Sequence, residues 1–516
     1  MIKYFHAVSL LIFLAGCDPT VRITSPQDGA TFETGETITF TCTARDIEDG
    51  ELSGDSIAWT SAIDGPLGTG NEFNTDELSP GAHTITVTAT DSAEGYGTDE
   101  ITVTVGQPAS TTTTSAPSST TTTVQFTGAE QHPFGSHAFA YVSRTIKPGH
   151  VSQTQMDDDT KAFYEKWKAH YLKSDCGQDQ YYVWSQGVSD PEGIATSEGM
   201  GYGMMIAAFM AGYDPAAKAI FNGLYRFVQD HPSESSSDLM AWLQVTDCQT
   251  GEDGAGPASD GDIDIAFALF LADAQWGSQG EINYRAEALR RTAAVLAYEI
   301  NKSTYYVHIG DPAIFPSHQD GTRTSDFIFD HFRTFEEISG DALWSSVIDR
   351  CYTILAKVQN SSTGLLPDFV RNAGTAPAAA GPYWLESPYD GHYYYNACRD
   401  PWRIGTDYLV SGDARALSAL GRINSWIHSS TSENPAHVNN GYLLNGTKLP
   451  GDETPELAFL APLGVSAMVD SGNQEWLNAL WDLVVAREIN DELDGYFGNT
   501  IKMLTMIVMS GNWWAP

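Results

Sequence analysis

The sequence predicts a two-domain protein, in which a small all-β sandwich is followed by a larger all-α domain of helical hairpins. At 516 residues the chain exceeds what one hydrophobic core usually supports. Its first part alternates β-branched and polar residues in short runs, whereas the rest repeats apolar residues at spacings of three and four. A run rich in Ser, Thr and Pro separates the two patterns.

Residues 1–16 are typical of a targeting segment, because one lysine precedes an apolar stretch too short to span a bilayer. The stretch ends Leu14-Ala15-Gly16-Cys17, which resembles the lipobox of bacterial lipoproteins. The resemblance implies a lipid on Cys17 and an exported, membrane-anchored lipoprotein that faces the periplasm or the cell exterior. An ordinary secretory cleavage nearby is the alternative. No other segment keeps ~18 apolar residues together, so no second span is expected.

The region 17–106 predicts the β-sandwich. Runs of alternating β-branched and polar residues lie between Gly, Asp and Pro clusters at 21–24, 36–44, 56–61, 83–91 and 99–106. The region resembles bacterial immunoglobulin-like and cadherin-like modules, which implies a spacer between anchor and catalytic unit, with sugar binding as the alternative. Asp46, Glu48 and Asp49 offer oxygen ligands for calcium, although an exposed acidic turn is more common.

Residues 107–127 are the predicted linker, because so much Ser, Thr and Pro cannot form a core. Residues 128–516 then contain stretches with helical apolar spacing at 158–173, 201–213, 216–230, 263–276, 284–300, 342–360, 413–429, 455–471, 474–488 and 499–511. Many of them are apolar on more than one face, which indicates helices buried on both sides. The pattern favours a closed array of about ten to twelve helices over a βα barrel.

Charge and cysteine content exclude some classes of protein. The 27 Lys and Arg against 66 Asp and Glu give a net charge of −39, which argues against a nucleic-acid partner. The charge suits a cationic polymer or a salty habitat. Six cysteines are present, and a lipid on Cys17 leaves an odd number. Export permits a disulfide among Cys176, Cys248, Cys351 and Cys398, without indicating which pair forms.

Two acidic runs stand out in the helical region. Glu198 opens a predicted helix in SEGMGYGMM. Each of its three glycines lowers helix stability by roughly 1 kcal/mol, and together they let a bulky group approach the backbone. A Glu that simply favours the positive end of the helix dipole is the structural alternative. In ASDGDIDIAF, Asp260, Asp262 and Asp264 crowd three carboxylates before an apolar helix. Their spacing does not fit an EF-hand, so they are expected to project from the helix N-terminus into a cavity.

The run 258–276, ASDGDIDIAFALFLADAQW, resembles the signature of glycoside hydrolase family eight, and SEGMGYGMM and the terminal SGNWW resemble two more of its motifs. The resemblance covers about 130–516. It implies an (α/α)6 barrel and an inverting, endo-acting hydrolase that needs no metal or organic cofactor. It also implies Glu198 as the general acid and Asp260 as the residue that contacts the sugar at the cleavage point.

The third motif departs from the commonest pattern of the family. Where endoglucanases of the family place the general base as Asp in a Tyr-Asp-Ala-x-Arg run, this chain has Tyr395-Asn396-Ala397-Cys398-Arg399. An amide cannot take a proton from water. The chain therefore resembles the chitosanase and lichenase branch, in which Asn replaces this Asp and a Glu on an inserted loop is the base.

This branch resemblance implies Glu386 as the base, with Asp390 as the alternative. Inversion needs a protonated acid and an ionised base on opposite faces of the sugar, about 6.5–9.5 Å apart. Glu198 is therefore expected in the less polar surroundings, with Asp260 distorting the sugar ring and Arg399 fixing the arrangement through charge-assisted bonds. Because the base lies on a loop, the site is expected to be completed only when sugar binds.

Aromatic residues near these motifs offer flat surfaces for stacking on sugars. The candidates are Trp184, Tyr202, Trp242, Phe332, Tyr383, Trp384, Tyr394, Tyr395 and Trp402. Asn396 and Arg399 are further candidates for substrate binding. His331 and Arg333 are candidates for the cleft lining, although a structural histidine is equally expected.

The sequence thus predicts an endo-acting hydrolase of a β-1,4-containing glycan, with chitosan and mixed-linkage β-glucan favoured over cellulose by the replaced base. The alternative from another class is a surface glycan-binding lipoprotein that has lost catalysis, which Asn396 motivates. A polysaccharide substrate and, through the lipid on Cys17, a membrane are the expected partners.

Overall fold

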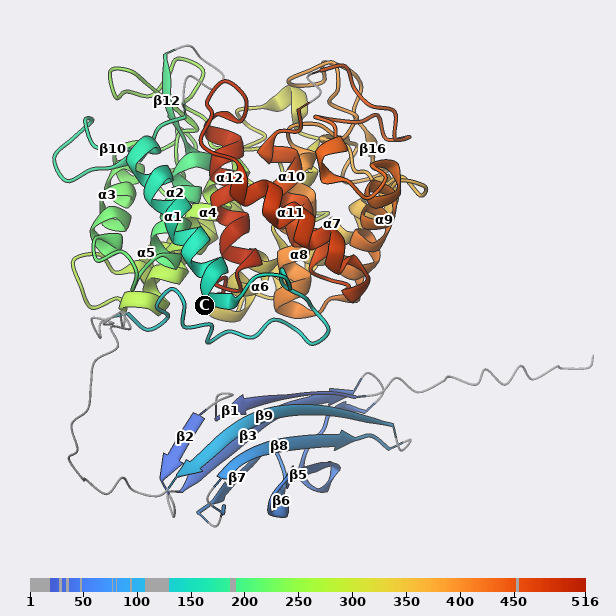
Figure 1. The fold of residues 1–516 in the computed structure, drawn as a ribbon. Coiled ribbons are helices and arrows are strands. Elements are labelled where there is room, and N and C mark those ends of the chain that lie inside the picture. The colour runs from blue at the N-terminus through green and yellow to red at the C-terminus, as the bar shows by residue number, and fades with distance from the viewer. Residues whose placement is uncertain are drawn as a thin grey trace, which may run out of the picture. The chain divides into compact units, whose positions relative to one another are not determined.

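The computed structural model describes residues 19–106 and 130–516, with gaps at 27–29, 34–36, 47–48, 77, 80, 93–94, 186–191 and 452–453. The chain divides into two compact units, Met1–Thr122 and Thr123–Pro516 (Figure 1). The targeting segment, Cys17 and the predicted linker at 107–127 lie outside the described residues. Within the described residues, no helix combines the length and apolar character needed to cross a membrane.

The first unit is a sandwich of two sheets (Figure 1). One sheet contains β1 (Thr20–Ser25), β3 (Ile38–Asp46), β4 (Gly50–Glu51) and β7 (Glu72–Thr75), and the other has the order β2 (Ala30–Glu33), β9 (Tyr96–Gly106), β8 (Gly81–Thr90), β5 (Ile57–Ser61), β6 (Gly65–Thr69). Alternate side chains of a strand face the core, and Phe40, Trp59 and Val87 are fully buried there. All five predicted strand runs form strands.

The acidic residues that offered calcium ligands in this unit do not form a cation site among the residues described. Asp46 accepts a hydrogen bond from the backbone N–H of Asp49 at 2.8 Å, which makes it part of a turn. Glu48 lies outside the described residues. No cluster of three or more potential metal ligands occurs in the described parts of either unit.

The described part of the second unit contains twelve α-helices in two rings (Figure 1). The outer helices are α1 (Gln153–Tyr171), α3 (Ala217–Asp230), α5 (Tyr284–Tyr298), α7 (Leu343–Val358), α9 (Ala414–Ser430) and α11 (Gln474–Ala486). The inner helices are α2 (Ser197–Phe209), α4 (Ser259–Trp276), α6 (Phe329–Ser339), α8 (Asp400–Ser411), α10 (Leu457–Ala467) and α12 (Gly495–Met509). Each inner helix packs against the next, and α12 contacts α2. The ring is therefore closed, and the unit is an (α/α)6 barrel.

Glycines let the first two inner helices approach closely. A Cβ atom on Gly201 of α2 would lie 2.6 Å from the Cβ of Asp264 on α4, and one on Gly261 would lie 2.5 Å from the carbonyl carbon of Ser197. Real Cβ atoms do not come this near, so both positions need glycine. This contact explains part of the glycine-rich run that follows Glu198.

Two inner helices, α6 and α8, were not among the stretches with helical apolar spacing. Their inward positions carry polar groups that are paired inside the barrel: Arg403 of α8 donates to Asp264 at 2.6 Å, and Nε2 of His331 on α6 lies 3.0 Å from the same carboxylate. Buried polar pairs replace apolar residues on these faces, so the hydrophobic period is lost.

The segments before the inner helices contain short strands, which gather at one end of the barrel (Figure 1). They are β10 (Leu172–Lys173), β11 (Tyr182–Val183) and β12 (Gly193–Thr196) before α2, β13 (Leu243–Val245) before α4, β14 (Thr322–Arg323) before α6, and β15 (Phe369–Arg371) and β16 (Ala378–Ala379) before α8. A disulfide between Cys176 and Cys248 joins the segments before α2 and α4, whereas Cys351 and Cys398 are buried thiols.

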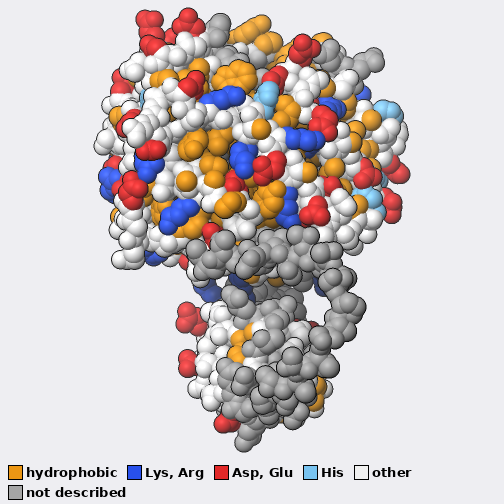
Figure 2. Space-filling model, turned by 60° about the vertical axis from the view of Figure 1, so that its left-hand side comes forward, with side chains coloured by type: hydrophobic (Ala, Val, Ile, Leu, Met, Phe, Trp, Pro, Cys, Tyr) orange, Lys and Arg blue, Asp and Glu red, His pale blue; other side chains and the backbone are white. Residues whose placement is uncertain are grey.

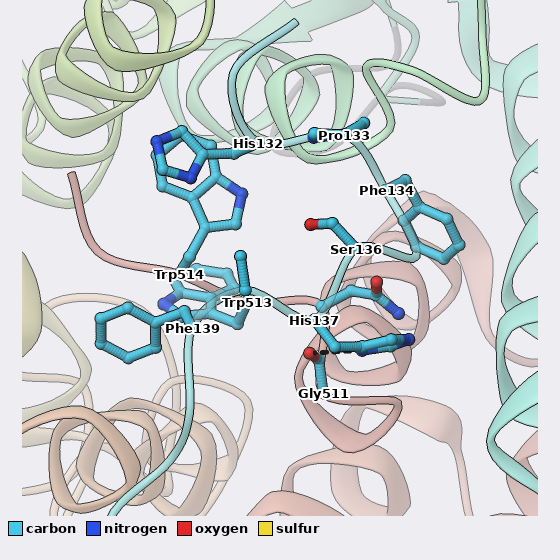
Figure 3. A pocket seen from close by; sticks show the side chains of 11 residues that line it. His132, Pro133, Phe134, Ser136, His137, Phe139, Gly511, Trp513 and Trp514 are labelled. Atoms are coloured by element: carbon cyan, nitrogen blue, oxygen red, sulfur yellow. Dashed lines mark hydrogen bonds between the residues drawn. The ribbon is translucent and has the colours of Figure 1, made fainter. Parts of the chain in front are cut away.

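The start of the barrel unit packs against the end of the chain (Figure 3). His132 stacks on Trp514 with ring centroids 4.3 Å apart, and the Nδ1 atom of His137 lies 3.0 Å from the carbonyl oxygen of Gly511. The other ring nitrogen of His137 pairs with Asp157 of α1 at 3.0 Å. The space between these residues is about 10 Å³, so the contact is a packed seam.

Candidate active site

A cavity of about 560 Å³ opens at the end of the barrel where the inner helices begin. The three predicted catalytic residues, Glu198, Asp260 and Glu386, all line it. Glu198 and Asp260 lie in the first turns of α2 and α4. The positive ends of these helix dipoles therefore point towards the cavity, which favours carboxylates there.

Glu198 is held by two donors. Its Oε1 atom accepts a hydrogen bond from the Tyr496 hydroxyl at 2.9 Å, and its Oε2 atom accepts one from Arg399 at 2.6 Å. Burial raises the pKa of Glu198 above its ordinary value, and the charge of Asp260 raises the pKa further, against the opposing effect of Arg399. A carboxyl group with a raised pKa keeps a proton that it can donate.

Asp260 lies between two guanidinium groups. Its Oδ2 atom accepts hydrogen bonds from Arg323 and Arg399, both at 2.9 Å. Although burial opposes ionisation, these two charges lower the pKa of Asp260 to about 2. Asp260 and Glu198 are therefore neighbouring carboxyl groups whose surroundings push their pKa values in opposite directions.

Glu386 follows β16 on an exposed loop and accepts a hydrogen bond from the side-chain amide of Asn396 at 2.8 Å. The side-chain oxygen of Asn396 (Oδ1) in turn accepts a hydrogen bond from Arg399 at 3.1 Å. A chain of hydrogen bonds thus runs from Glu198 through Arg399 and Asn396 to Glu386. An Asp at position 396 would place a second carboxylate beside Glu386, where like charges repel.

Asp390, the alternative base, has a structural role. It is buried, does not line the cavity, and accepts hydrogen bonds from the backbone N–H groups of Leu385, Glu386 and Ser387 at 2.6, 3.0 and 2.8 Å. The carboxylate therefore fixes the turn that carries Glu386. To act as the base, Asp390 would have to break all three of these hydrogen bonds.

Trp384 anchors the same loop from its other side. Its ring packs against Gly321 and lies 5.5 Å from the ring of Phe369, and its carbonyl oxygen lies 2.6 Å from Nε2 of His318. Glu386 lines the cavity in this structure, and contacts of Trp384 and Asp390 hold its loop from both sides. The expectation of a site that is completed only on binding stays a prediction.

The sequence placed several substrate-binding candidates correctly at the cavity. Trp242, Tyr395, Asn396 and Arg399 line it. Trp184, Tyr383 and Tyr394 do not line it, and Trp384 serves as the loop anchor.

Three aromatic candidates are core residues. Phe332 of α6 is fully buried, with its ring 5.4 Å from that of Trp344, so its assignment to substrate binding is wrong. Tyr202 and Trp402 are also fully buried, and their rings pack 5.8 Å apart between α2 and α8. These rings lie on inner helices below the helix ends, where side chains meet neighbouring helices and not solvent.

His331 and Arg333 are structural as well. His331 is buried, with Nε2 3.0 Å from Asp264 and its ring stacked 3.6 Å from that of Phe267. Arg333 pairs with Asp407 and Asp413. Neither residue lines the cavity.

Several residues that line the cavity were not predicted from the sequence. They are Asp253, Phe315, Arg323, Glu456, Asp494, Tyr496 and Phe497. Glu456 precedes α10 and accepts hydrogen bonds from the Tyr395 hydroxyl at 2.7 Å and the Asn440 amide at 3.1 Å. A pattern could have found Tyr496, because it lies in the first turn of α12, the closing helix that SGNWW follows, but no sequence signal marks Arg323.

Comparison with known proteins agrees with this geometry. The sequence model of glycosyl hydrolases family 8 matches residues 150–511, and the model of the bacterial Ig domain matches residues 19–87. A β-glucanase of Niallia circulans is 45% identical over 389 residues, which are 75% of this chain and 92% of the relative. An endoglucanase of Bacillus sp. (strain KSM-330) is 37% identical over 385 residues, or 72% of this chain and 80% of the relative.

A solved structure has the same barrel. The apo structure of a β-1,3-1,4-glucanase from Paenibacillus sp. X4 superposes with a TM-score of 0.71 at 45% identity. The match covers 75% of this chain and 99% of that chain.

Proposed function

This chain belongs to glycosyl hydrolases family 8 and is an endo-acting glucan hydrolase, and we propose that its substrate is mixed-linkage β-1,3-1,4-glucan. The observation that carries the proposal is one cavity that holds both a half-buried Glu198, which accepts two hydrogen bonds, and an exposed Glu386, which accepts one from Asn396. The β-1,3-1,4-glucanase at 45% identity supports this substrate class.

In the proposed mechanism, Glu198 donates its proton to the glycosidic oxygen while the bond from that oxygen to the anomeric carbon breaks. Glu386 takes a proton from a water molecule, which attacks the anomeric carbon from the opposite face. The water oxygen forms the new bond, so a β linkage yields an α-anomeric product. The net reaction consumes one water molecule and leaves Glu198 ionised and Glu386 protonated before the next turnover.

Asp260 is proposed to contact the sugar ring at the cleavage point. Its carboxylate is ionised and held by Arg323 and Arg399, so it can stabilise the positive charge that develops on the ring in the transition state. Trp242 and Tyr395 are proposed to stack on sugar units along the cavity.

Chitosan is a second candidate substrate, which the charge of the cavity favours. Six carboxyl side chains line it, those of Glu198, Asp253, Asp260, Glu386, Glu456 and Asp494, against the two guanidinium groups of Arg323 and Arg399. An excess of negative charge would attract a polymer of glucosamine. On the face drawn in Figure 2, acidic, basic and hydrophobic side chains of the barrel unit are interspersed.

Hydrolysis assays would separate these candidates. Reducing-sugar release from lichenan, carboxymethylcellulose and chitosan should be fastest on lichenan, and the first product should be the α-anomer by NMR. Fastest release from chitosan, falling steeply with added salt, would favour the second candidate. Release from none of the three would support the glycan-binding alternative.

We also propose that Cys17, which lies outside the described residues, carries the lipid that holds the protein at a membrane. The run Leu14-Ala15-Gly16-Cys17 supports this proposal. Metabolic labelling with palmitate should mark the chain and should fail for Cys17→Ser, which should appear in the soluble fraction. Labelling that survives the substitution would contradict the anchor.

A further inference from the structure

Arg323 reaches the cavity from the sheet that also leads to the Glu386 loop. It lies on β14, opposite Phe369 of β15, and β15 pairs with β16, which precedes the loop. Its guanidinium lies over the Phe369 ring at 5.6 Å, and its side chain is only 12% exposed. Packing thus fixes the position from which this cation faces the cavity.

Arg323 belongs to a row in which guanidinium and carboxyl groups alternate. Its Nε atom lies 3.8 Å from buried Asp326, and its Nη1 atom lies 2.9 Å from Asp260. Asp260 continues the row to Arg399 at 2.9 Å, and the same nitrogen of Arg399 contacts Glu198 at 2.6 Å. One nitrogen of Arg399 is therefore shared between two carboxyl groups, and Asp260 has a second cation whereas Glu198 does not.

We propose that Arg323 is a positioning residue for catalysis, which neutralises Asp260 so that Arg399 remains divided between Asp260 and the general acid. This inference rests on the proposed roles of Glu198 and Asp260. Without Arg323, one guanidinium would face two carboxyl groups in a buried site. Arg399 would then turn towards Asp260 and away from Glu198, and the proton donor would lose its alignment.

The charged groups that face Arg323 set the direction of the effect. They are Asp326 beside it, Asp260 from α4, Glu386 from the loop and Arg399 before α8. The positive charge of Arg323 lowers the pKa of Asp260 and of Glu198. Loss of that charge raises both pKa values, and because Glu198 is the proposed acid, the basic limb of the bell-shaped pH profile should move to higher pH.

The test compares pH profiles of hydrolysis for the full chain and four variants. Arg323→Met and Arg323→Gln remove the charge, and Gln keeps a hydrogen-bond donor in case the Met variant does not fold. Arg323→Lys keeps the charge. Arg371→Met is the matched control, because Arg371 is an exposed arginine on β15 of the same sheet that does not line the cavity.

The neutral variants should lose on the order of 10²-fold in kcat, with little change in KM, and the basic limb should shift upwards by about one pH unit. Arg323→Lys should keep the limbs in place, and the control should match the parent. A folded neutral variant with the parent profile, or an equal shift in Arg323→Lys, would overturn the inference. Inactivity of the parent on every glucan would instead overturn the proposed function.

Discussion

Glu198 owes its proposed role to surroundings and not to residue type. It and Asp260 share Arg399, yet burial raises the pKa of Glu198, whereas Asp260 also bonds directly to Arg323 and has its pKa lowered to about 2. Chemistry at this scale depends on contacts between residues far apart in the sequence. A motif can identify Glu198, but the contact that separates it from Asp260 comes through Arg323.

Glu198→Gln should abolish most turnover. The amide keeps the shape and can still bond to Tyr496, but it has no acidic proton, so kcat on lichenan should fall about 10²–10⁴-fold. Glu492→Gln is the control, because Glu492 is exposed and lies outside the cavity. Initial rates of reducing-sugar release would measure both. Near-parental turnover in Glu198→Gln would remove Glu198 from the role of acid.

Asn396→Asp should lower activity at acidic and neutral pH. The new carboxylate would replace the amide that donates to Glu386, and two adjacent carboxylates resist ionising together. One of the two should therefore hold a proton, which moves the acidic limb of the pH profile to higher pH.

The same substitution in a Glu386→Gln background has the opposite consequence. It supplies a new carboxylate close to the lost base, so part of the activity should return relative to Glu386→Gln alone. Comparison of the three variants by pH-dependent kcat on lichenan tests the idea that positions 386 and 396 share one function. Equal kcat values for Glu386→Gln and for the double variant would contradict this idea.

The sequence predicted some residues of the site correctly placed at the cavity and misassigned others. Glu198, Asp260, Glu386, Asn396 and Arg399 were predicted because they lie in or beside motifs, and all five line one cavity. Residues such as Phe332 were misassigned because nearness to a motif in sequence does not tell whether a ring faces solvent or a neighbouring helix.

At the scale of elements, the approach of α2 to α4 positions both Glu198 and Asp260. Gly201→Ala should destabilise the barrel by about 1–3 kcal/mol, because the new Cβ would overlap the Cβ of Asp264. Gly421→Ala on exposed α9 meets no atom within 4 Å and should stabilise it by about 0.5–1 kcal/mol. Urea unfolding followed by tryptophan fluorescence measures both changes. Equal effects of the two substitutions would show that close packing of α2 on α4 is not the cause.

Helix periodicity predicted ten of the twelve helices in the described barrel, and it failed where charge replaces apolar contact. The inner faces of α6 and α8 carry His331 and Arg403, which both contact Asp264 of α4. Only the folded ring reveals these pairs, since each joins two separate helices. The disulfide between Cys176 and Cys248 likewise depends on two loops that meet in space.

At the scale of the whole molecule, each unit has its own core, and the cavity is lined only by residues of the barrel unit. A chain of residues 123–516 should therefore keep its kcat on soluble lichenan. Turnover of the shortened and the full chain, at equal concentrations of folded protein, would check this. A large loss of kcat would mean that the sandwich unit contributes to the site.

The stability of the barrel should depend on pH through carboxyl groups buried in it. Burial raises the pKa of Asp326 and of Asp368 to about 7, whereas both ionise near 4 in an unfolded chain. Between about pH 4 and 7 the folded state therefore holds more protons than the unfolded state, and stability falls as pH rises. Each group contributes a slope of up to about 1.4 kcal/mol per pH unit. Below about pH 4 the sign reverses, because Asp260, with a pKa of about 2, must take up a proton.

The free energy of unfolding, measured from pH 3 to 8 by barrel tryptophan fluorescence, should thus be highest near pH 4 to 5. Asp326→Asn removes one titrating group and should flatten the decline towards neutral pH, whereas Asp158→Asn, at an exposed position of the outer helix α1, should leave it unchanged. The net charge of −39 adds repulsion that also grows with pH, but this repulsion acts largely between exposed charges. High salt screens exposed charges far more than buried ones. If the fall in unfolding free energy disappears at high salt, or persists in full in Asp326→Asn, the pH dependence comes from exposed charges. The buried carboxyl groups would then not be its cause.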